Sequence, residues 1–275
     1  MKALKNHLIL FDAECPMCRI YTQAFVESGM LDNDGRTAYQ DLPAQACPML
    51  DKQRAVNEIA LVNQKTGEVT YGVESLFKVF ATSFPVLKPL FLFRPFVWLM
   101  SKIYAFIAFN RRVIIPAPVA ANSFELQPTF KLNYRMAYLF VTWLLTAIVL
   151  SAYARLMPGL LPEGSVYREY LICGGQILFQ GAIISIIHKY KRWDYLGNMM
   201  TISFGGALLL LPVLFLAQGL NLHPLFCATW FMAVAGLMLL EHVRRSKLLE
   251  LGWILTISWV LYRILVLLLI LLKSN

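Results

Sequence analysis

Five long apolar runs in the C-terminal half constrain this chain more than any other feature of its sequence. They lie at residues 136–153, 170–187, 196–217, 222–240 and 251–272. About 20 such residues, at ~1.5 Å each, form a helix that crosses the hydrocarbon core of a bilayer. Hydrophobic residues make up 58% of the 275-residue chain, against roughly half in an ordinary soluble domain. The sequence predicts an all-α polytopic bundle of five transmembrane helices.

Lysine and arginine residues gather beside alternate ends of these runs. The two richer connections carry Lys189, Lys191 and Arg192, and Arg244, Arg245 and Lys247. The other two connections hold only Arg155 and Arg168. Because cytoplasmic loops carry the excess of basic residues, we expect the richer connections on the cytoplasmic side of an inner membrane. The same rule, with no signal-peptide pattern at the N-terminus, predicts a cytoplasmic N-terminal domain and an external C-terminus.

The formal net charge is +9, with a pI near 9.4. Because the basic residues cluster at the ends of apolar segments, the charge indicates anionic membrane lipids as a partner, and no nucleic acid.

A pair of cysteines follows a short apolar run near the N-terminus, in the sequence LILFDAECPMC at residues 8–18. The pattern predicts a buried strand that leads into a helix. A sulfur on the first turn of a helix lies near unpaired N–H groups and the positive end of the helix dipole, which favours the thiolate. Cys15 is therefore the expected nucleophile. Cys18, one turn further on, is expected to resolve the mixed disulfide.

The remaining N-terminal residues alternate between strand and helix patterns. A turn at 29–35 precedes a short strand at 37–42, and a loop with a short helix follows at 42–55. Residues 57–72 form the pattern of a β-hairpin, and 73–83 that of an amphipathic helix. The order β-α-β-α-β-β-α predicts a thioredoxin-like α/β domain.

Asp12, Cys15 and Cys18 in DAECPMC resemble the D-G-x-C-x-x-C signature of the DCC family of thiol-disulfide oxidoreductases. Residues 66–80 resemble the family's later strand, turn and helix, and 103–112 its closing segment. The resemblance implies a thioredoxin-like fold and dithiol chemistry. Ala13 stands where the family has glycine, which predicts a less tight turn. No proline precedes the strand at 57–62, so substrate docking need not follow the thioredoxin pattern.

We divide the chain into a thioredoxin-like DCC domain at 1–83, an amphipathic interfacial segment at 84–118 that closes it, a linker at 119–134 and the five-helix domain at 135–275. Prolines and the charges of Lys88, Arg94 and Lys102 interrupt the apolar residues of 84–118. This favours a segment in the membrane interface. A sixth crossing is the alternative, and it would invert the topology.

Asp12 and the closing segment each have two alternative roles. Asp12 could accept a proton from Cys18, or it could cap the turn by accepting N–H groups two or three residues on. Asn110, Arg111 and Arg112 match the family's closing segment. We expect them to form an anchor at the membrane surface, with substrate contact as the alternative.

Arg263 lies 13 residues after Glu250 and 10 before Lys273, near the predicted bilayer midplane. An ionised group is costly there, and the five runs contain no acidic residue. We expect Arg263 to form a site within the membrane domain. The candidate partners of its charge are Gln176, Gln180, a backbone carbonyl, and an anionic or quinone-like ligand. The alternative is that its side chain reaches the outer surface.

These observations predict a thiol-disulfide oxidoreductase that reduces a disulfide of a protein client, with catalytic residues Cys15, Cys18 and Asp12. We expect no metal and no cofactor beyond the Cys15–Cys18 disulfide. The two cysteines have two alternative roles: they bind zinc together with His7 and Cys47, or they form an inert dithiol. There are two alternative functions. The first is a non-catalytic membrane adaptor or assembly factor, and the second is a quinone- or lipid-binding membrane redox protein.

Overall fold

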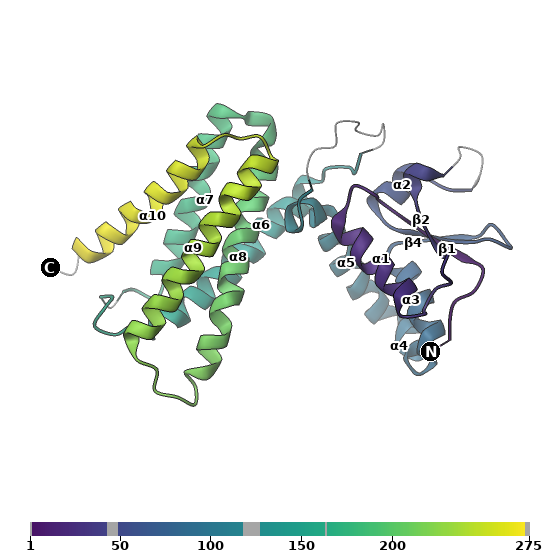
Figure 1. Ribbon diagram of the computed structural model, residues 1–275, viewed down its shortest axis with the longest axis horizontal. Helices are drawn as coiled ribbons and strands as arrows, with labels where there is room; N and C mark the ends of the chain where they lie inside the picture. Colours follow the sequence, from purple (N-terminus) through teal and green to yellow (C-terminus); the bar gives the residue numbers. More distant parts are fainter. Residues whose placement is uncertain (1, 43–48, 118–126, 163, 273–275) are drawn as a thin grey trace. The chain divides into compact units, whose positions relative to one another are not determined.

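The computed structural model describes residues 2–42, 49–117, 127–162 and 164–272. The chain forms two compact units, Met1–Tyr134 and Arg135–Asn275. The N-terminal unit contains a four-stranded sheet in the order β2-β1-β3-β4 (Figure 1). Its strands are β1 (His7–Phe11), β2 (Arg36–Ala38), β3 (Ala60–Asn63) and β4 (Val69–Tyr71). β1 pairs parallel with β2 and antiparallel with β3, and β3 pairs antiparallel with β4, so the sheet is mixed.

Successive residues of β1 are buried on opposite faces of the sheet. Ile9 packs with Leu61 and Phe25, whereas Leu10 packs with Ala60 and Ala55. This alternation follows from the two-residue period of a strand. Helices cover both faces: α1 (Pro16–Glu27), α2 (Lys52–Asn57) and α3 (Gly72–Ser83). The central strand is therefore buried on both sides, as its nearly continuous apolar sequence predicts.

The β3–β4 hairpin turns where the sequence predicts it. The Asn63 side chain accepts the backbone N–H of Lys65 at 2.9 Å, and Gly67 has a φ of +73°. By contrast, the strand expected at 37–42 ends early, because β2 stops at Ala38 and Tyr39–Asp41 form a 3-10 turn. This turn brings the Gln40 side chain to Asp12.

A long helix closes the N-terminal unit after a sharp bend. The 3-10 turn η2 (Pro85–Leu87) and α4 (Lys88–Leu92) precede α5 (Arg94–Ile114), and the two helical segments meet at 88°. α5 packs along α3, and its Tyr104 hydroxyl accepts the N–H of Ile59 at 3.0 Å. Residues 85–114 are thus part of the folded unit.

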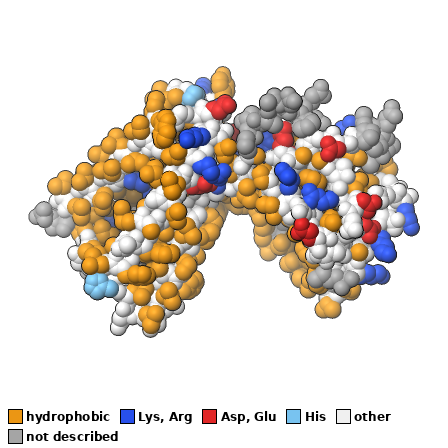
Figure 2. All heavy atoms as spheres, viewed as in Figure 1, with side chains coloured by type: hydrophobic (Ala, Val, Ile, Leu, Met, Phe, Trp, Pro, Cys, Tyr) orange, Lys and Arg blue, Asp and Glu red, His pale blue; other side chains and the backbone are white. Residues whose placement is uncertain are grey.

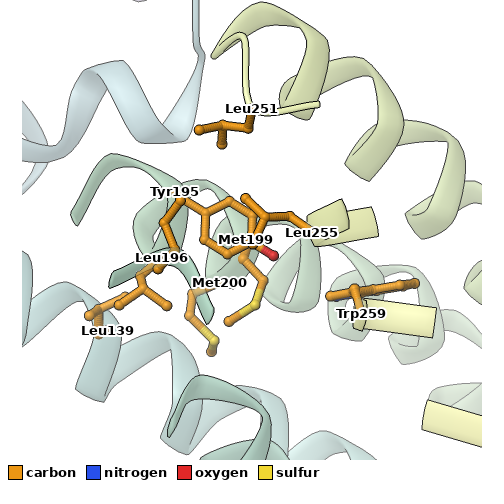
Figure 3. Close-up of a cluster of buried hydrophobic side chains, with 9 residues drawn as sticks. Leu139, Tyr195, Leu196, Met199, Met200, Leu251, Leu255 and Trp259 are labelled. Atoms are coloured by element: carbon orange, nitrogen blue, oxygen red, sulfur yellow. The ribbon is translucent and has the colours of Figure 1, made fainter. Parts of the chain in front are cut away.

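Within its described residues, the C-terminal unit has five helices that are long and apolar enough to cross a membrane. In the N-terminal unit, the bent segment of η2, α4 and α5 is also long and apolar enough if it is taken as one broken span. The five candidate spans contain α6 (Leu132–Ala154), α7 (Arg168–Ile187), η3 (Lys189–Lys191) with α8 (Arg192–Leu216), α9 (Pro224–Leu248) and α10 (Ile254–Leu272). Tyr195 and Met199 of α8 pack against Leu255 and Trp259 of α10 in the main apolar core (Figure 3).

The two basic connections lie at the same end of this unit. The Lys191 ammonium group donates to the carbonyl of Leu249 at 2.8 Å, which joins the α7–α8 connection to the α9–α10 connection. Arg135 at the start of α6 donates to the carbonyl of Trp193 at 2.6 Å. Figure 2 shows Lys and Arg side chains toward this end, on a surface that is otherwise largely hydrophobic.

Candidate active site

The two cysteines lie at the N-terminus of α1, directly after β1. Cys15 is the N-cap residue, and its sulfur accepts the backbone N–H of Cys18 at 3.4 Å. Pro16 occupies the first turn, where its lack of an N–H costs no hydrogen bond. The Cys15 sulfur therefore lies at the positive end of the helix dipole, as the sequence predicts.

The surroundings shift the acidities of the two thiols in opposite directions. The pKa of Cys15 is lowered to about 7, mainly by a hydrogen bond from the Cys18 side chain. Burial raises this pKa, whereas the positive charge of Arg111 lowers it further. The hydrogen bond to Cys15 and burial raise the pKa of Cys18 above its usual value. Cys15 is thus the group that ionises near neutral pH, whereas Cys18 keeps its proton.

Arg111 brings its charge to the dithiol from the last turn of α5. Its guanidinium donates to Asp12 Oδ2 at 2.9 Å and to the carbonyls of Val56 and Asn57 at 2.6 and 2.9 Å. Only 5% of its side chain is exposed. These three acceptors fix the guanidinium between the end of β1 and the last turn of α2.

Both carboxylate oxygens of Asp12 accept hydrogen bonds. Besides Arg111, it accepts the side-chain amide of Gln40 at 3.0 Å and the backbone N–H of Glu14 at 3.0 Å, both on Oδ1. The bond to Glu14 is the turn-capping interaction expected for an aspartate at this position. Asp12 therefore connects β1, the turn before Cys15, and α5.

The closing segment differs from the surface anchor that the sequence suggested. Asn110 is fully buried and donates to the carbonyls of Phe106 and Tyr134 at 2.9 and 3.1 Å. Since Asn110 and Arg111 bond inside the unit, they are not available to a lipid surface. Arg112 is 40% exposed and lies 3.2 Å from Glu14 and 3.6 Å from Asp12, so it too belongs to the charged cluster behind the dithiol.

Apolar side chains enclose the two sulfurs. Cys15 and Cys18 are only 1% and 3% exposed, and they pack with Phe11, Ala38 and Tyr21. Another molecule reaches the Cys15 sulfur only after part of this cover moves. Ala13 has no positive φ, so the turn before Cys15 accommodates its Cβ without strain, and its N–H donates to Gln40 Oε1 at 3.1 Å.

Of the residues proposed for a zinc site, Cys47 lies outside the described part of the chain. His7 is on β1, where Nδ1 lies 2.8 Å from the carbonyl of Lys5. Within the described ranges, no three His, Cys, Asp or Glu side chains gather as metal ligands.

The sequence did not assign Gln40 or Arg111 to the site. Gln40 carried no motif signal, because its role depends on where β2 ends. Arg111 did carry one, since it falls in the segment that resembles the DCC family, but its basic neighbours suggested a membrane surface instead.

The residues expected to surround Arg263 separate into two groups. Gln176 and Arg263 line one cavity between the helices. Gln180, one turn beyond Gln176, is instead bonded to Tyr195 at 2.8 Å and to Ser258 at 3.2 Å. Gln180 therefore belongs to a separate, satisfied network.

The described residues combine a mixed four-stranded sheet, a dithiol at the N-terminus of its first helix, and five helices long and apolar enough to cross a membrane. This is the architecture of a dithiol domain joined to a candidate membrane bundle. Residues 9–115 match the family model of the DCC1-like thiol-disulfide oxidoreductases, so the N-terminal unit contains a DCC1-like domain. No curated protein and no solved structure gives a match. The predicted resemblance and the predicted fold class, an α/β domain followed by five helices, are both confirmed.

Proposed function

We propose that this protein is a membrane-tethered thiol-disulfide oxidoreductase that exchanges disulfides through Cys15 and Cys18. The observation that carries the proposal is the position of Cys15 as the N-cap of α1, where its sulfur accepts the N–H of Cys18. The opposite pKa shifts of the two thiols support it. At neutral pH a pKa of about 7 leaves roughly half of Cys15 as the thiolate, against about 1% for a thiol with the reference value of 9.0. The thiolate is the nucleophile in disulfide exchange.

The exchange proceeds in two steps. The Cys15 thiolate attacks one sulfur of the client disulfide, an S–S bond forms between Cys15 and the client, and the other client sulfur leaves as a thiolate. Cys18 then loses its proton and attacks the Cys15 sulfur. The client's second sulfur leaves, and the Cys15–Cys18 disulfide forms. Two electrons pass from the dithiol to the client, whose two thiolates take up protons from water.

Asp12 contributes first by holding Arg111 beside the sulfurs. Its predicted role as acceptor of the Cys18 proton remains part of the proposal. Because Arg111 is bonded to Oδ2, a proton taken by Asp12 would weaken this ion pair. Because the weakened ion pair destabilises protonated Asp12, Asp12 would hold the proton only briefly.

The predicted direction is reduction of the client, because the cytosol keeps dithiols of ordinary potential reduced. A second turnover then requires a cytosolic dithiol reductant that returns two electrons to the Cys15–Cys18 disulfide. The proposed cytoplasmic side for the N-terminal unit is supported by the basic connections gathered at one end of the bundle.

We place the outer surface of α4 and α5 against anionic lipids of the inner membrane. Leu92, Phe93 and Trp98 are 70%, 58% and 64% exposed. Lys88, Arg94 and Lys102 belong to the same two helices and are also exposed. Exposed apolar residues with interleaved basic ones suit a helix in the membrane interface.

Trapping with Cys18→Ala tests this function. The variant cannot resolve the mixed disulfide, so full-length protein from cells should carry a client through Cys15 that reductant releases. Cys15→Ser with Cys18→Ala is the matched control and should carry none. Equal recovery of adducts from both variants, or none from either, would contradict the proposal.

The burial of both sulfurs favours one other function, a membrane adaptor that binds a partner without turnover. An adaptor requires no accessible thiolate. It predicts that Cys15→Ser retains every partner bound by the native protein, whereas an oxidoreductase loses the clients that it holds through sulfur.

A further inference from the structure

A small cavity lies between the helices of the C-terminal unit, with a volume of about 70 Å³. All five candidate spans line it, and four of them contribute a polar residue from near the middle of the helix. These polar residues are Thr146 of α6, Gln176 of α7, Ser203 of α8 and Arg263 of α10. α9 contributes apolar side chains such as Val234.

Three of these side chains have polar atoms without a partner. Gln176 Nε2, Thr146 Oγ1 and Arg263 Nε are buried and make no hydrogen bond to the described residues. Gln176 and Thr146 are only 6% and 3% exposed. Because a buried polar group without a hydrogen bond destabilises a fold, such groups normally face a ligand or water. All three can donate, so they suit a ligand with acceptor oxygens.

The charge of Arg263 restricts the ligand further. Arg263 lies at the midpoint of α10, and the cavity lining contains no Asp or Glu. Its guanidinium stacks 4.0 Å from the centre of the Trp259 ring, a contact that leaves its N–H groups free for an acceptor. An ionised group at mid-span is costly without a partner, and the lining supplies no opposite charge, which favours an anionic ligand.

We propose that this cavity binds the carboxylate of a fatty acid, which pairs with Arg263 and accepts from Gln176 and Thr146. The volume favours a carboxylate over a quinone, because an apolar protein cavity that binds a benzene ring measures about 150 Å³. The rest of the lining, including Leu150, Ile172 and Met238, is apolar and suits an acyl chain that continues into the lipid. This site is independent of the proposed dithiol chemistry.

Equilibrium binding of radiolabelled oleate to the delipidated full-length protein tests the site. The wild type should bind oleate saturably, and Arg263→Gln should bind it at least about tenfold more weakly, since it loses the ion pair. Arg244→Gln is the control, because Arg244 is an exposed arginine paired with Glu241 at the end of α9. Unlabelled oleyl alcohol should not compete. Equal binding by Arg263→Gln and the wild type, or equal competition by the alcohol, would overturn the proposal.

Two near-isosteric variants keep the test valid if Arg263→Gln does not fold. Gln176→Leu and Thr146→Val remove a donor without removing the charge, and each should weaken oleate binding several-fold. Oleate should raise the Tm of the wild type and of Arg244→Gln, and less so that of Gln176→Leu. Unchanged affinity in both donor variants would also overturn the site.

Discussion

The carboxylate of Asp12 and the guanidinium of Arg111 meet at 2.9 Å in the interior of the N-terminal unit, although 99 positions separate them in the sequence. Both side chains are almost fully buried. The pair joins the end of β1 to the last turn of α5, beside the dithiol. The helix that closes the domain is thus also part of its candidate active site.

Replacing Arg111 with methionine should slow the reaction of Cys15. The positive charge helps to lower the pKa of Cys15, so its loss raises that pKa. Alkylation by iodoacetamide at pH 7 should fall about tenfold. The unfolding free energy should also fall by about 3–5 kcal/mol, because Asp12 is left as a buried charge without its main partner. Arg112→Met, at a partly exposed position, is the matched control, and equal effects from the two variants would contradict the assignment.

The reactivity of Cys15 should follow the ionisation of its thiol. With a pKa of about 7, the rate of alkylation should rise between about pH 6 and 8 and level off above. Because this pKa is lower than the unfolded value, Cys15 stabilises the fold fully only above pH 9.0, and the contribution disappears as the pH falls through about 7. Urea unfolding of the wild type and Cys15→Ser across this range measures the difference. A midpoint near the reference value would exclude a lowered pKa.

Substitution of Asp12 by asparagine separates its two roles. Asp12 raises the pKa of Cys15, so Asp12→Asn should leave the attacking step as fast or faster at pH 7. If Asp12 accepts the Cys18 proton, release of the client from the mixed disulfide should become at least about tenfold slower. Stopped-flow measurement of both steps with a model disulfide distinguishes the roles. Unchanged release would restrict Asp12 to positioning Arg111.

Gln40→Ala should destabilise the turn before Cys15. The Gln40 amide donates to Asp12 and accepts from the N–H of Ala13. Loss of both bonds should cost about 1–2 kcal/mol in unfolding free energy. Gln23→Ala on the exposed face of α1, where Gln23 donates only to Glu27, is the control and should cost much less.

The outer surface of α5 should contact lipid. The fluorescence of Trp98, obtained as the difference between the wild type and Trp98→Phe in nanodiscs, should be quenched by brominated lipids because this ring is 64% exposed. Trp259, which is 2% exposed in the bundle core, should be quenched much less in the same comparison with Trp259→Phe. Equal protection of both rings would remove the support for an interfacial α5.

Local signals in the sequence were enough to predict the strand before Cys15, the dithiol helix, the β3–β4 hairpin and the five apolar helices. Each depends on periodicity, on a turn residue or on helix length within one segment. The contact between Arg111 and Asp12 was not predictable in this way, because it depends on how α5 packs against the sheet. Gln176 and Gln180 show the same limit: four residues apart on one helix, they contact different neighbours.

The position of Arg111 on α5 gives that helix two faces with different tasks. Its inner face carries the guanidinium that tunes the acidity of Cys15, and its outer face carries the exposed Trp98 and Leu99. Any rotation or translation of α5 would move the charge of Arg111 and so alter the electric field at the Cys15 sulfur. With α5 at the proposed lipid surface, the rate at which the thiol reacts would then report how firmly this helix contacts lipid.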